Sequence, residues 1–251
     1  GKHPMCGLNP FPLFNDIRFE IPHAYIGFEA AARLVEGCAA SISIDSTVAD
    51  AASSQIIARK TQASESAGRI VLSAHMDMDY DTPGAIDNAV GVVALVGLME
   101  RLKDWDSPFA LEFLPFNGED YCEASGQIAY IKHNGDDFTK VRLCVNIDDA
   151  GLQGSLNAVS RYNLPNAYAT VIEDAVTRNA TMTIGEEWYA SDHTIFAMRG
   201  VPAIAIASSE LMGETIRLTH TPHDTPDKVG MELVEGMIDF ITEVVKRLTK
   251  L

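Results

Sequence analysis

Apolar strand-like runs alternate with helical segments along most of the chain, and this alternation is the feature that most limits its fold. Four runs have the length and composition of buried strands: residues 69–75, 110–116, 141–148 and 202–208. Five segments with helical composition separate or follow them: residues 88–103, 124–133, 164–179, 191–199 and 231–248. Strands that alternate with helices predict a largely parallel sheet with helices on both faces.

The N-terminal part of the chain has weaker patterns. Residues 1–22 contain four prolines and no clear period, so we expect an irregular arm there. A helix is expected over 28–36, and two β-rich runs follow at 41–45 and 54–60. No internal repeat and no long linker divides the sequence. We therefore expect residues 1–251 to form a single α/β domain around a central, mostly parallel mixed sheet.

The composition excludes several kinds of partner. With 19 Lys and Arg against 35 Asp and Glu, the chain has a formal net charge of −16. Nucleic acids and anionic membranes would repel such a chain, so neither is expected as a partner. No apolar run is long enough to span a membrane. The four cysteines lack the spacing of a disulfide scaffold or a zinc finger, which indicates free or buried thiols.

The start of the sequence bears on the compartment. The chain begins at Gly1, without a Met and without a charged-then-apolar leader. This favours the cytoplasm over secretion, but a trimmed N-terminus would look the same, so the compartment stays open. The oligomeric state is not indicated by any pattern in the sequence.

Polar residues follow the predicted strands at the points where each strand ends, which is where α/β sheets collect their functional groups. His75 and Asp77 close the first run and point the same way in an extended chain. Asp87 stands directly before the long helix, where it could also be a simple N-cap. Glu119 and Asp120 follow the second run, where a solvated loop is the alternative.

The same pattern continues toward the C-terminus. Asp148 and Asp149 follow the third run, and His220 and His223 lie in a loop before the terminal helix. Each group alone has an ordinary structural explanation. Together they place two imidazoles and several carboxylates at one rim of the sheet, which suits a pair of zinc-like ions with one bridging carboxylate. One carboxylate would then not be needed as a metal ligand and could act as a general base.

Six motifs carry a family resemblance: AHMD (74–77), GAIDNAVGV (84–92), FNGED (116–120), NIDDAG (146–151), SDHTIF (191–196) and HTPHDTPDKV (220–229). Through them, from about residue 54 to the C-terminus, the sequence resembles the M28 family of zinc aminopeptidases. This family is part of the di-zinc exopeptidase group with a phosphorylase/hydrolase-like fold. The resemblance implies that the domain is a catalytic, zinc-exopeptidase-like peptidase domain.

The resemblance also implies roles for individual residues. It assigns five ligands to two Zn²⁺ ions: His75 and Asp148 to one ion, Asp120 and His220 to the other, and Asp87 to both, with a cis peptide bond after it. Other divalent ions are possible at such a site. Glu119 would be the general base, and Asp77 would orient His75.

Two choices between neighbours follow from the family pattern. NxDxxG matching and strand alternation both select Asp148 as the ligand, so we expect Asp149 to point elsewhere. HTPxDT matching selects His220 and leaves His223 as a pocket-wall or surface residue. Residues Ser191, Asp192 and His193 match a motif that supports the ligands from behind. An N-capped helix is the alternative for these three.

The sequence departs from the family at two of these positions. The family usually has Glu where this chain has Asp120, which is one methylene shorter but still offers hard oxygen ligands. Thr219 stands where the family often has a Tyr that steadies the developing oxyanion. Tyr189 and Tyr121 are the candidate substitutes.

The expected activity is hydrolysis of the N-terminal residue of a peptide with a free α-amine. Glu119 would activate the attacking water, and one metal with neighbouring carboxylates would hold the amine. One alternative is a single-zinc glutaminyl cyclase-like acyltransferase. Others are a carboxypeptidase or deacylase on the same fold, or a non-catalytic binding domain. The preferred N-terminal residue is not predicted.

Overall fold

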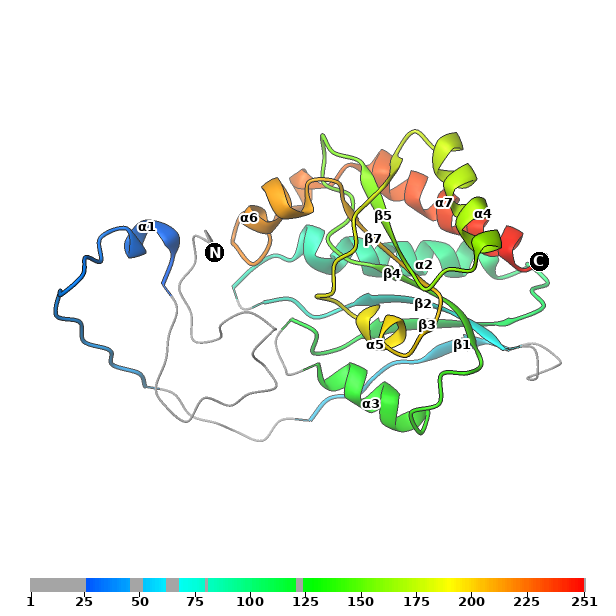
Figure 1. Cartoon of the computed structure of the whole chain (residues 1–251), viewed down its shortest axis with the longest axis horizontal. Helices are drawn as coiled ribbons and strands as arrows, with labels where there is room; N and C mark the ends of the chain where they lie inside the picture. The colour runs from blue at the N-terminus through cyan, green and yellow to red at the C-terminus, as the bar shows by residue number, and fades with distance from the viewer. Residues whose placement is uncertain (1–25, 46–51, 62–67, 80, 121–123, 251) are drawn as a thin grey trace.

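The computed structural model describes residues 26–45, 52–61, 68–79, 81–120 and 124–250 (Figure 1). The expected arm at 1–22 and the candidate Tyr121 lie outside the described residues. The described part holds one sheet of seven strands in the order β1-β3-β2-β4-β7-β5-β6. Their bounds are β1 Ala58–Lys60, β2 Arg69–His75, β3 Ala110–Phe116, β4 Val141–Ile147, β5 Asn157–Tyr162, β6 Met182–Ile184 and β7 Ala203–Ser208.

The middle of this sheet is parallel. β2 pairs in parallel with β3 and β4, and β4 pairs in parallel with β7. The antiparallel pairs are β1 with β3 and β5 with β7, while β6 runs parallel to β5. A mostly parallel mixed sheet is therefore present, as the alternating pattern predicted. Because β2, β3, β4 and β7 run the same way, their carboxyl ends share one edge.

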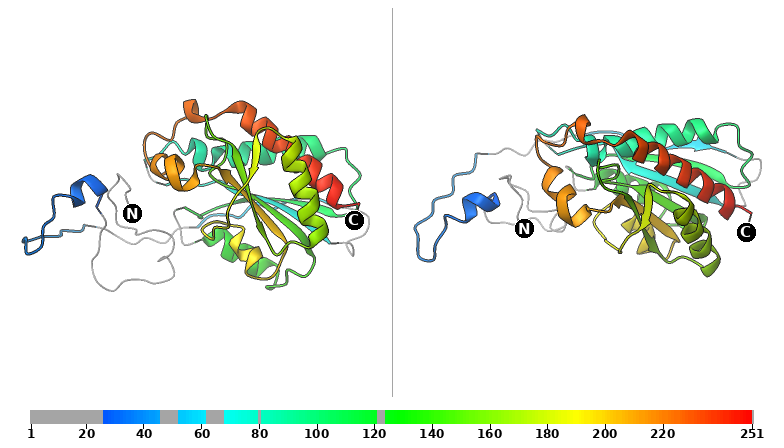
Figure 2. Two further views of the ribbon diagram at one scale, coloured as in Figure 1. Left: turned by 45° about the horizontal axis from the view of Figure 1, so that its top comes forward. Right: turned by 90° about the horizontal axis from the view of Figure 1, so that it is seen from above.

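Helices cover both faces of the sheet (Figures 1 and 2). On one face lie α2 (Val90–Leu102), α4 (Asn166–Arg178) and α7 (Met231–Leu248), and on the other lie α3 (Ser125–His133) and α5 (Thr194–Ala197). Successive side chains of a strand point to opposite faces, so Leu72 packs in the core under α2 and α7, while Val71 packs in the core under α3 and α5. The two-sided prediction is confirmed.

The terminal helix shows why its sequence forms this element. Its apolar residues recur at three- and four-residue spacing and are buried against the sheet: Leu233, Val234, Met237, Ile238, Ile241, Val244, Val245 and Leu248. The remaining short elements are α1 Phe28–Ala31, η3 Ala85–Ala89, η4 Leu211–Thr215, α6 Ile216–Leu218 and η5 Pro226–Lys228. Within the described residues, no helix combines the length and the apolar composition that a bilayer crossing needs.

Several predicted elements are shorter than expected or absent. Residues 41–45 form no strand, and the expected strand over 54–60 is reduced to β1. The expected helix over 28–36 is one turn long, and that over 191–199 covers only α5. Most residues of 41–45 and of 30–36 are exposed, so these segments bury no apolar face that would stabilise a strand or a longer helix.

Two strands were not expected from the sequence. β5 and β6 extend the sheet beyond β7, and β5 runs antiparallel to it with Val159 opposite Ile206. β5 alternates polar and apolar residues too weakly to indicate a strand, and it forms because the exposed edge of β7 offers backbone partners.

One buried acid stabilises the edge of the sheet. Glu112 of β3 is fully buried and accepts a hydrogen bond from Arg59 Nε (2.5 Å) and another from the Tyr130 hydroxyl. Arg69 Nε lies 3.6 Å from the same carboxylate. The charge is thus paired and hydrogen-bonded, as a buried carboxylate must be.

We expect Glu112→Gln to lower the free energy of unfolding by about 2–4 kcal/mol, because it leaves buried donors with a weaker acceptor. Chemical denaturation monitored by circular dichroism measures the change. As a control, Arg101→Gln breaks the Arg101–Asp239 pair, whose side chains are both more than half exposed, and should change stability little. Equal effects of the two substitutions would contradict the prediction.

Candidate metal centre

The carboxyl ends of three parallel strands bring acids and an imidazole to one edge of the sheet. β2 ends at His75, β4 is followed by Asp148, and β3 leads into the loop that carries Glu119 and Asp120. In the β2–β3 ladder His75 lies opposite Phe116, the last residue of β3. The register of the sheet thus places the candidate ligands side by side.

Asp87 lies at the centre of the cluster and contacts both imidazoles. Its Oδ1 is 3.0 Å from His75 Nε2, and its Oδ2 is 2.8 Å from His220 Nε2. Asp148 Oδ1 also lies 3.0 Å from His75 Nε2, and Asp120 Oδ1 lies 3.1 Å from His220 Nε2. Each imidazole therefore has its own carboxylate, and the two share Asp87.

The donor atoms form groups that could hold metal ions. Each of three groups has its donor atoms within 4.8 Å of one another: His75–Asp87–Asp148, Asp87–Asp120–His220 and His75–Glu119–Asp120. Imidazole nitrogen and carboxylate oxygen are ligands that zinc accepts. Asp120 Oδ2 is also buried and has no hydrogen-bond partner within the described part of the chain. A divalent cation would satisfy such an oxygen, so the residues fit a metal.

Two further carboxylates hold the ligand loops from behind. Asp224 is fully buried and accepts the backbone N–H groups of Ile86 (Oδ1, 2.7 Å) and Asp87 (Oδ2, 3.0 Å). Asp77 accepts the backbone N–H groups of Glu119 and Asp120, each at 3.1 Å. In both cases one carboxylate holds the amides of two successive residues. This fixes the backbone from which the side chain of Asp87, or those of Glu119 and Asp120, enter the site.

The contact between Asp77 and His75 differs from the expectation. His75 Nδ1 lies 3.1 Å from the backbone carbonyl of Asp77 but 3.9 Å from its Oδ1. The carbonyl therefore orients the ring, and the carboxylate serves the Glu119 loop instead. Side-chain alternation alone put both groups on one side and could not show that the loop amides compete for the carboxylate.

The turn that carries Asp87 has an unusual backbone. The peptide bond between Asp87 and Asn88 is cis, as the family resemblance implied. Asn88 Nδ2 donates to the carbonyl of Ile147 (2.8 Å), which ties the turn to the end of β4, and its Oδ1 accepts the N–H of Gly91 (3.1 Å). The side chain of Asn88 thus caps α2, while that of Asp87 remains directed into the site.

Burial and neighbouring charges shift the pKa values of the site. Burial lowers the pKa of His220, but hydrogen bonds with Asp120 and Asp87 outweigh it and raise the pKa to about 12. Burial likewise opposes the charge on His75, yet Asp148 and Glu119 raise its pKa well above the usual range. For Glu119, burial raises the pKa well above its usual range, against the effect of His75.

Ser191, Asp192 and His193 are buried behind the ligands. Ser191 Oγ accepts from Asn146 Nδ2 (2.9 Å), and Asp192 Oδ1 accepts from Gln127 Nε2 (2.7 Å). Burial is the main reason that the pKa of Asp192 rises to about 7. No side-chain hydrogen bond caps α5, so the alternative of a plain N-capped helix is not what the structure has. His193 Nε2 lies 2.8 Å from the Trp188 carbonyl.

Of the remaining candidate residues that the structure describes, only Thr219 lines the cavity that contains the candidate ligands. A cavity of about 120 Å³ is lined by the ligands together with Glu119, Asp149, Ala190, Ile216 and Thr219. The Thr219 hydroxyl donates to the Thr215 carbonyl (3.2 Å). Tyr189 is 53% exposed, its hydroxyl donates to Glu187 (2.8 Å), and it does not line this cavity. His223 is exposed and also lies outside the lining.

Two acids have positions that sequence reasoning did not give. Asp149, which has a positive φ of 58° after β4, lines the same cavity as the candidate ligands but belongs to none of the candidate ligand groups. Asp224 received no role from sequence reasoning. Its position in the HTPHDTPDKV motif was the available signal, yet only the tertiary structure shows that it contacts the Asp87 turn.

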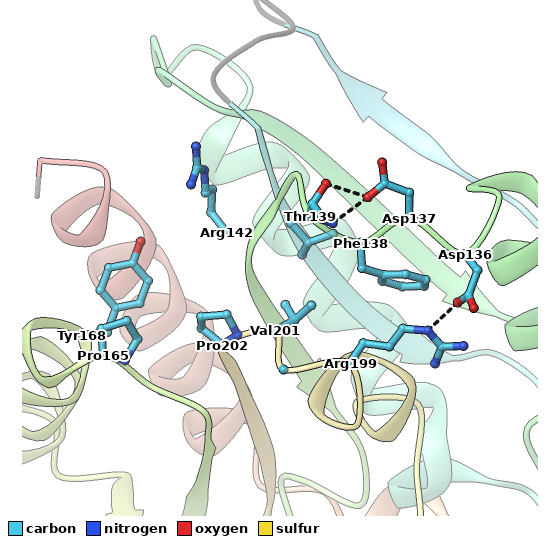
Figure 3. A pocket seen from close by; sticks show the side chains of 12 residues that line it. Asp136, Asp137, Phe138, Thr139, Arg142, Pro165, Tyr168, Arg199, Val201 and Pro202 are labelled. Carbon is cyan, nitrogen blue, oxygen red and sulfur yellow. Dashed lines mark hydrogen bonds and ion pairs between the residues drawn. The ribbon is translucent and has the colours of Figure 1, made fainter.

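A larger cavity of about 570 Å³ lies at the opposite end of the sheet (Figure 3). Its lining includes Val141 and Pro202, at the amino ends of β4 and β7. Arg199 in its wall pairs with Asp136 (2.6 Å) and lies 4.9 Å from the centre of the Phe138 ring. Arg199 and Asp136 are thus paired with each other, and none of the lining residues belongs to the candidate ligand groups.

The fold and the site define an α/β protein with a cluster of carboxylates and imidazoles, suited to metal ions, at the carboxyl edge of its sheet. The family model described as "Peptidase family M28" matches residues 55–245. The chain therefore belongs to peptidase family M28. No curated protein is similar enough to the chain to count as a relative.

Solved structures agree in fold. A zinc aminopeptidase from Bacillus subtilis superposes with a TM-score of 0.68 at 21% identity, covering 77% of this chain and 50% of that one. An aminopeptidase from Aneurinibacillus sp. strain AM-1 has a TM-score of 0.65 at 23% identity, covering 77% and 47%. A glutaminyl cyclase from an Acidobacteriales bacterium has a TM-score of 0.63 at 19% identity, covering 77% and 73%. The chain spans about half the length of these two aminopeptidases.

We expect Asp224→Asn to weaken Zn²⁺ binding by roughly 10- to 100-fold, because an amide offers only one acceptor oxygen to two backbone N–H groups. Competition with a chromogenic chelator measures the dissociation constant. Asp227→Asn is the matched control, since Asp227 is exposed in the same loop and contacts Thr225 and Lys228. Equal zinc affinity in the Asp224 variant and the control would refute the role of Asp224.

Zinc binding to metal-depleted protein should release protons at pH 7. The pKa values of His75 and His220 are raised, so both imidazoles carry a proton that a metal must displace. Protons compete with the metal, so the apparent affinity rises as the pH rises. Calorimetry in two buffers of different ionisation enthalpy counts the protons. His220→Ala should release fewer, whereas the exposed His223→Ala should match the wild type, and buffer-independent heats would contradict the prediction.

Proposed function

We propose that the chain is a zinc-dependent exopeptidase that removes the N-terminal residue from peptides with a free α-amine. The observation that carries the proposal is the shared carboxylate. Asp87 directs one oxygen to His75 and the other to His220, which suits two ions bridged by one ligand. Asp148 would complete the first ligand set, and Asp120 the second.

Bound zinc would polarise the substrate carbonyl and lower the pKa of water near it. Glu119 would take the proton from the attacking water. Its raised pKa suits a group that must then hold this proton. The same residue would pass the proton to the leaving amine as the peptide bond breaks. Asp77 fixes Glu119 through its backbone N–H (3.1 Å), so the base keeps its place during both transfers.

The charge of the cavity supports a substrate with a free amine. Its lining contains carboxylates and imidazoles, and no Lys or Arg is among these residues. An ammonium group would be attracted to such a lining, whereas an N-acetylated peptide end would bring no positive charge. This favours an aminopeptidase over a carboxypeptidase, whose substrate needs a basic group to hold the terminal carboxylate.

Turnover of aminoacyl-anilides beside their N-acetylated forms, with and without a chelator, tests the class of activity. We expect cleavage of the free-amine forms only, lost on chelation and restored by Zn²⁺. Cleavage of acetylated substrates, or activity that survives complete metal removal, would contradict the proposal.

Glutaminyl cyclization is the second candidate, because a glutaminyl cyclase structure shares the fold over 73% of its own length. The two activities differ in product and in metal count. An N-terminal glutaminyl peptide would lose ammonia and cyclise in one case and lose a free glutamine in the other. Mass spectrometry of this product, with native mass spectrometry of the zinc-loaded protein, decides between them. One ion per chain together with a cyclised product would favour the cyclase.

Glu119→Gln should lower kcat by about 10²–10⁴-fold or more, because glutamine keeps the shape of the side chain but takes no proton. Zinc content should remain that of the wild type, since the five proposed ligands are intact. Steady-state kinetics with metal analysis of the same sample checks both parts. Near-normal kcat in a fully loaded variant would show that another group acts as the base.

A further inference from the structure

Asp149 is a buried acid in the metal cavity that the proposed mechanism leaves without a use. It follows Asp148 at the end of β4 and lines the cavity, but it belongs to none of the three candidate ligand groups. Its Oδ1 is buried and has no hydrogen-bond partner in the described part of the chain. A carboxylate oxygen in this situation is costly unless a ligand satisfies it.

A second cavity, of about 310 Å³, is lined by a residue that contacts Asp149. The N–H of Ser208, which lines this second cavity, donates to the Asp149 carbonyl (2.8 Å). Two chain segments also contribute residues to both cavities. Trp188 and Met212 line the second cavity, while their near neighbours in sequence, Ala190 and Ile216, line the first. Asp149 therefore lies in the wall of the first cavity and contacts, through its backbone, a residue that lines the second cavity, which we call the side pocket.

The side pocket combines apolar walls with negative charge. Small residues of β5 and β7, among them Ala158 and Ala207, leave its floor open, and Trp188, Leu211 and Met212 supply apolar surface. Glu186 and Glu187 also line it, and no Lys, Arg or His is among the lining residues. Such a lining fits a side chain with an aliphatic stem and a positive end.

We propose that Asp149 and this side pocket select peptides whose N-terminal residue is Lys or Arg. The inference rests on the proposed aminopeptidase activity and adds the substrate class. A basic side chain would place its cation beside carboxylates while its stem covers the apolar walls. A neutral residue such as leucine would bury Asp149 further and leave it unpaired, which penalises that substrate.

The α-ammonium group of the substrate is the other cation that Asp149 could bind. Every N-terminal residue carries that group, so loss of the Asp149 charge would then slow all substrates alike. A side-chain role predicts a loss confined to Lys and Arg. The backbone contact of Asp149 with Ser208 of the side pocket, and the two further acids that line that pocket, favour the side-chain role.

The test compares kcat/KM for lysyl-, arginyl-, leucyl- and norleucyl-anilides, of which norleucyl is the neutral counterpart of lysyl. We expect the wild type to prefer Lys and Arg over norleucine, and Asp149→Asn to lose about 10- to 100-fold on the basic substrates only. Asparagine tolerates the positive φ of this position, so the backbone is kept while the charge is removed.

Asp136→Asn is the matched control. Asp136 also has a positive φ (59°), and its loss changes the net charge by the same amount, but it lies in the wall of the cavity at the opposite end of the sheet. This variant should keep the substrate preference of the wild type. Calorimetric binding of free lysine and of free norleucine to the zinc-loaded protein gives a second readout that needs no turnover.

Two results would overturn the inference. A wild type that cleaves norleucyl- or leucyl-anilide as fast as lysyl-anilide has no such selectivity, and a uniform loss in Asp149→Asn assigns the residue to the α-ammonium. Failure to cleave any aminoacyl-anilide would instead refute the proposed function. In that case lysine binding that is tighter than norleucine binding, and is lost in Asp149→Asn, would still support the pocket.

Discussion

The shared contact of Asp87 with both imidazoles is the constraint on which the rest of the site depends. A carboxylate that contacts one imidazole through each oxygen has to be held in one orientation, so its backbone has to be fixed from more than one side. Asp224 holds the amide of Asp87, and Asn88 ties the next residue to the end of β4. The long helix α2 begins immediately after the turn, and its buried residues anchor the turn to the core.

Several carboxylates lie close together in the site, and hydrogen bonds to the backbone hold the loops that carry them. Burial raises the pKa of Asp120 to about 6, while hydrogen bonds to His220 and His75 lower the pKa of Asp87 despite its burial. Neighbouring carboxylates in one small cavity repel each other unless cations lie between them. Backbone amides held by Asp77 and Asp224 keep the ligands in place against that repulsion.

Sequence reasoning predicted the parallel sheet, its helical layers and the strand ends at which the site lies, because period and composition report burial directly. It did not predict β5 and β6, whose sequences are ambiguous until β7 offers a free edge. Strand alternation selected Asp148 over Asp149 as a ligand, and Asp149 is in none of the candidate ligand groups. It did not predict that Asp149 would also line the cavity, because alternation holds only while the chain stays extended and Asp149 has a positive φ of 58°.

The sequence by itself determined which chemical groups stand at the strand ends and which family the chain resembles, since both depend on residue type and spacing alone. Tertiary structure alone decided that Asp77 accepts hydrogen bonds from the Glu119 loop, that Asp224 supports Asp87, and that Asp149 lines the same cavity as the candidate ligands. These contacts join residues far apart in the chain, or follow a turn of the backbone. Their partners are set by how β2, β3, β4 and β7 align, and no local pattern records that alignment.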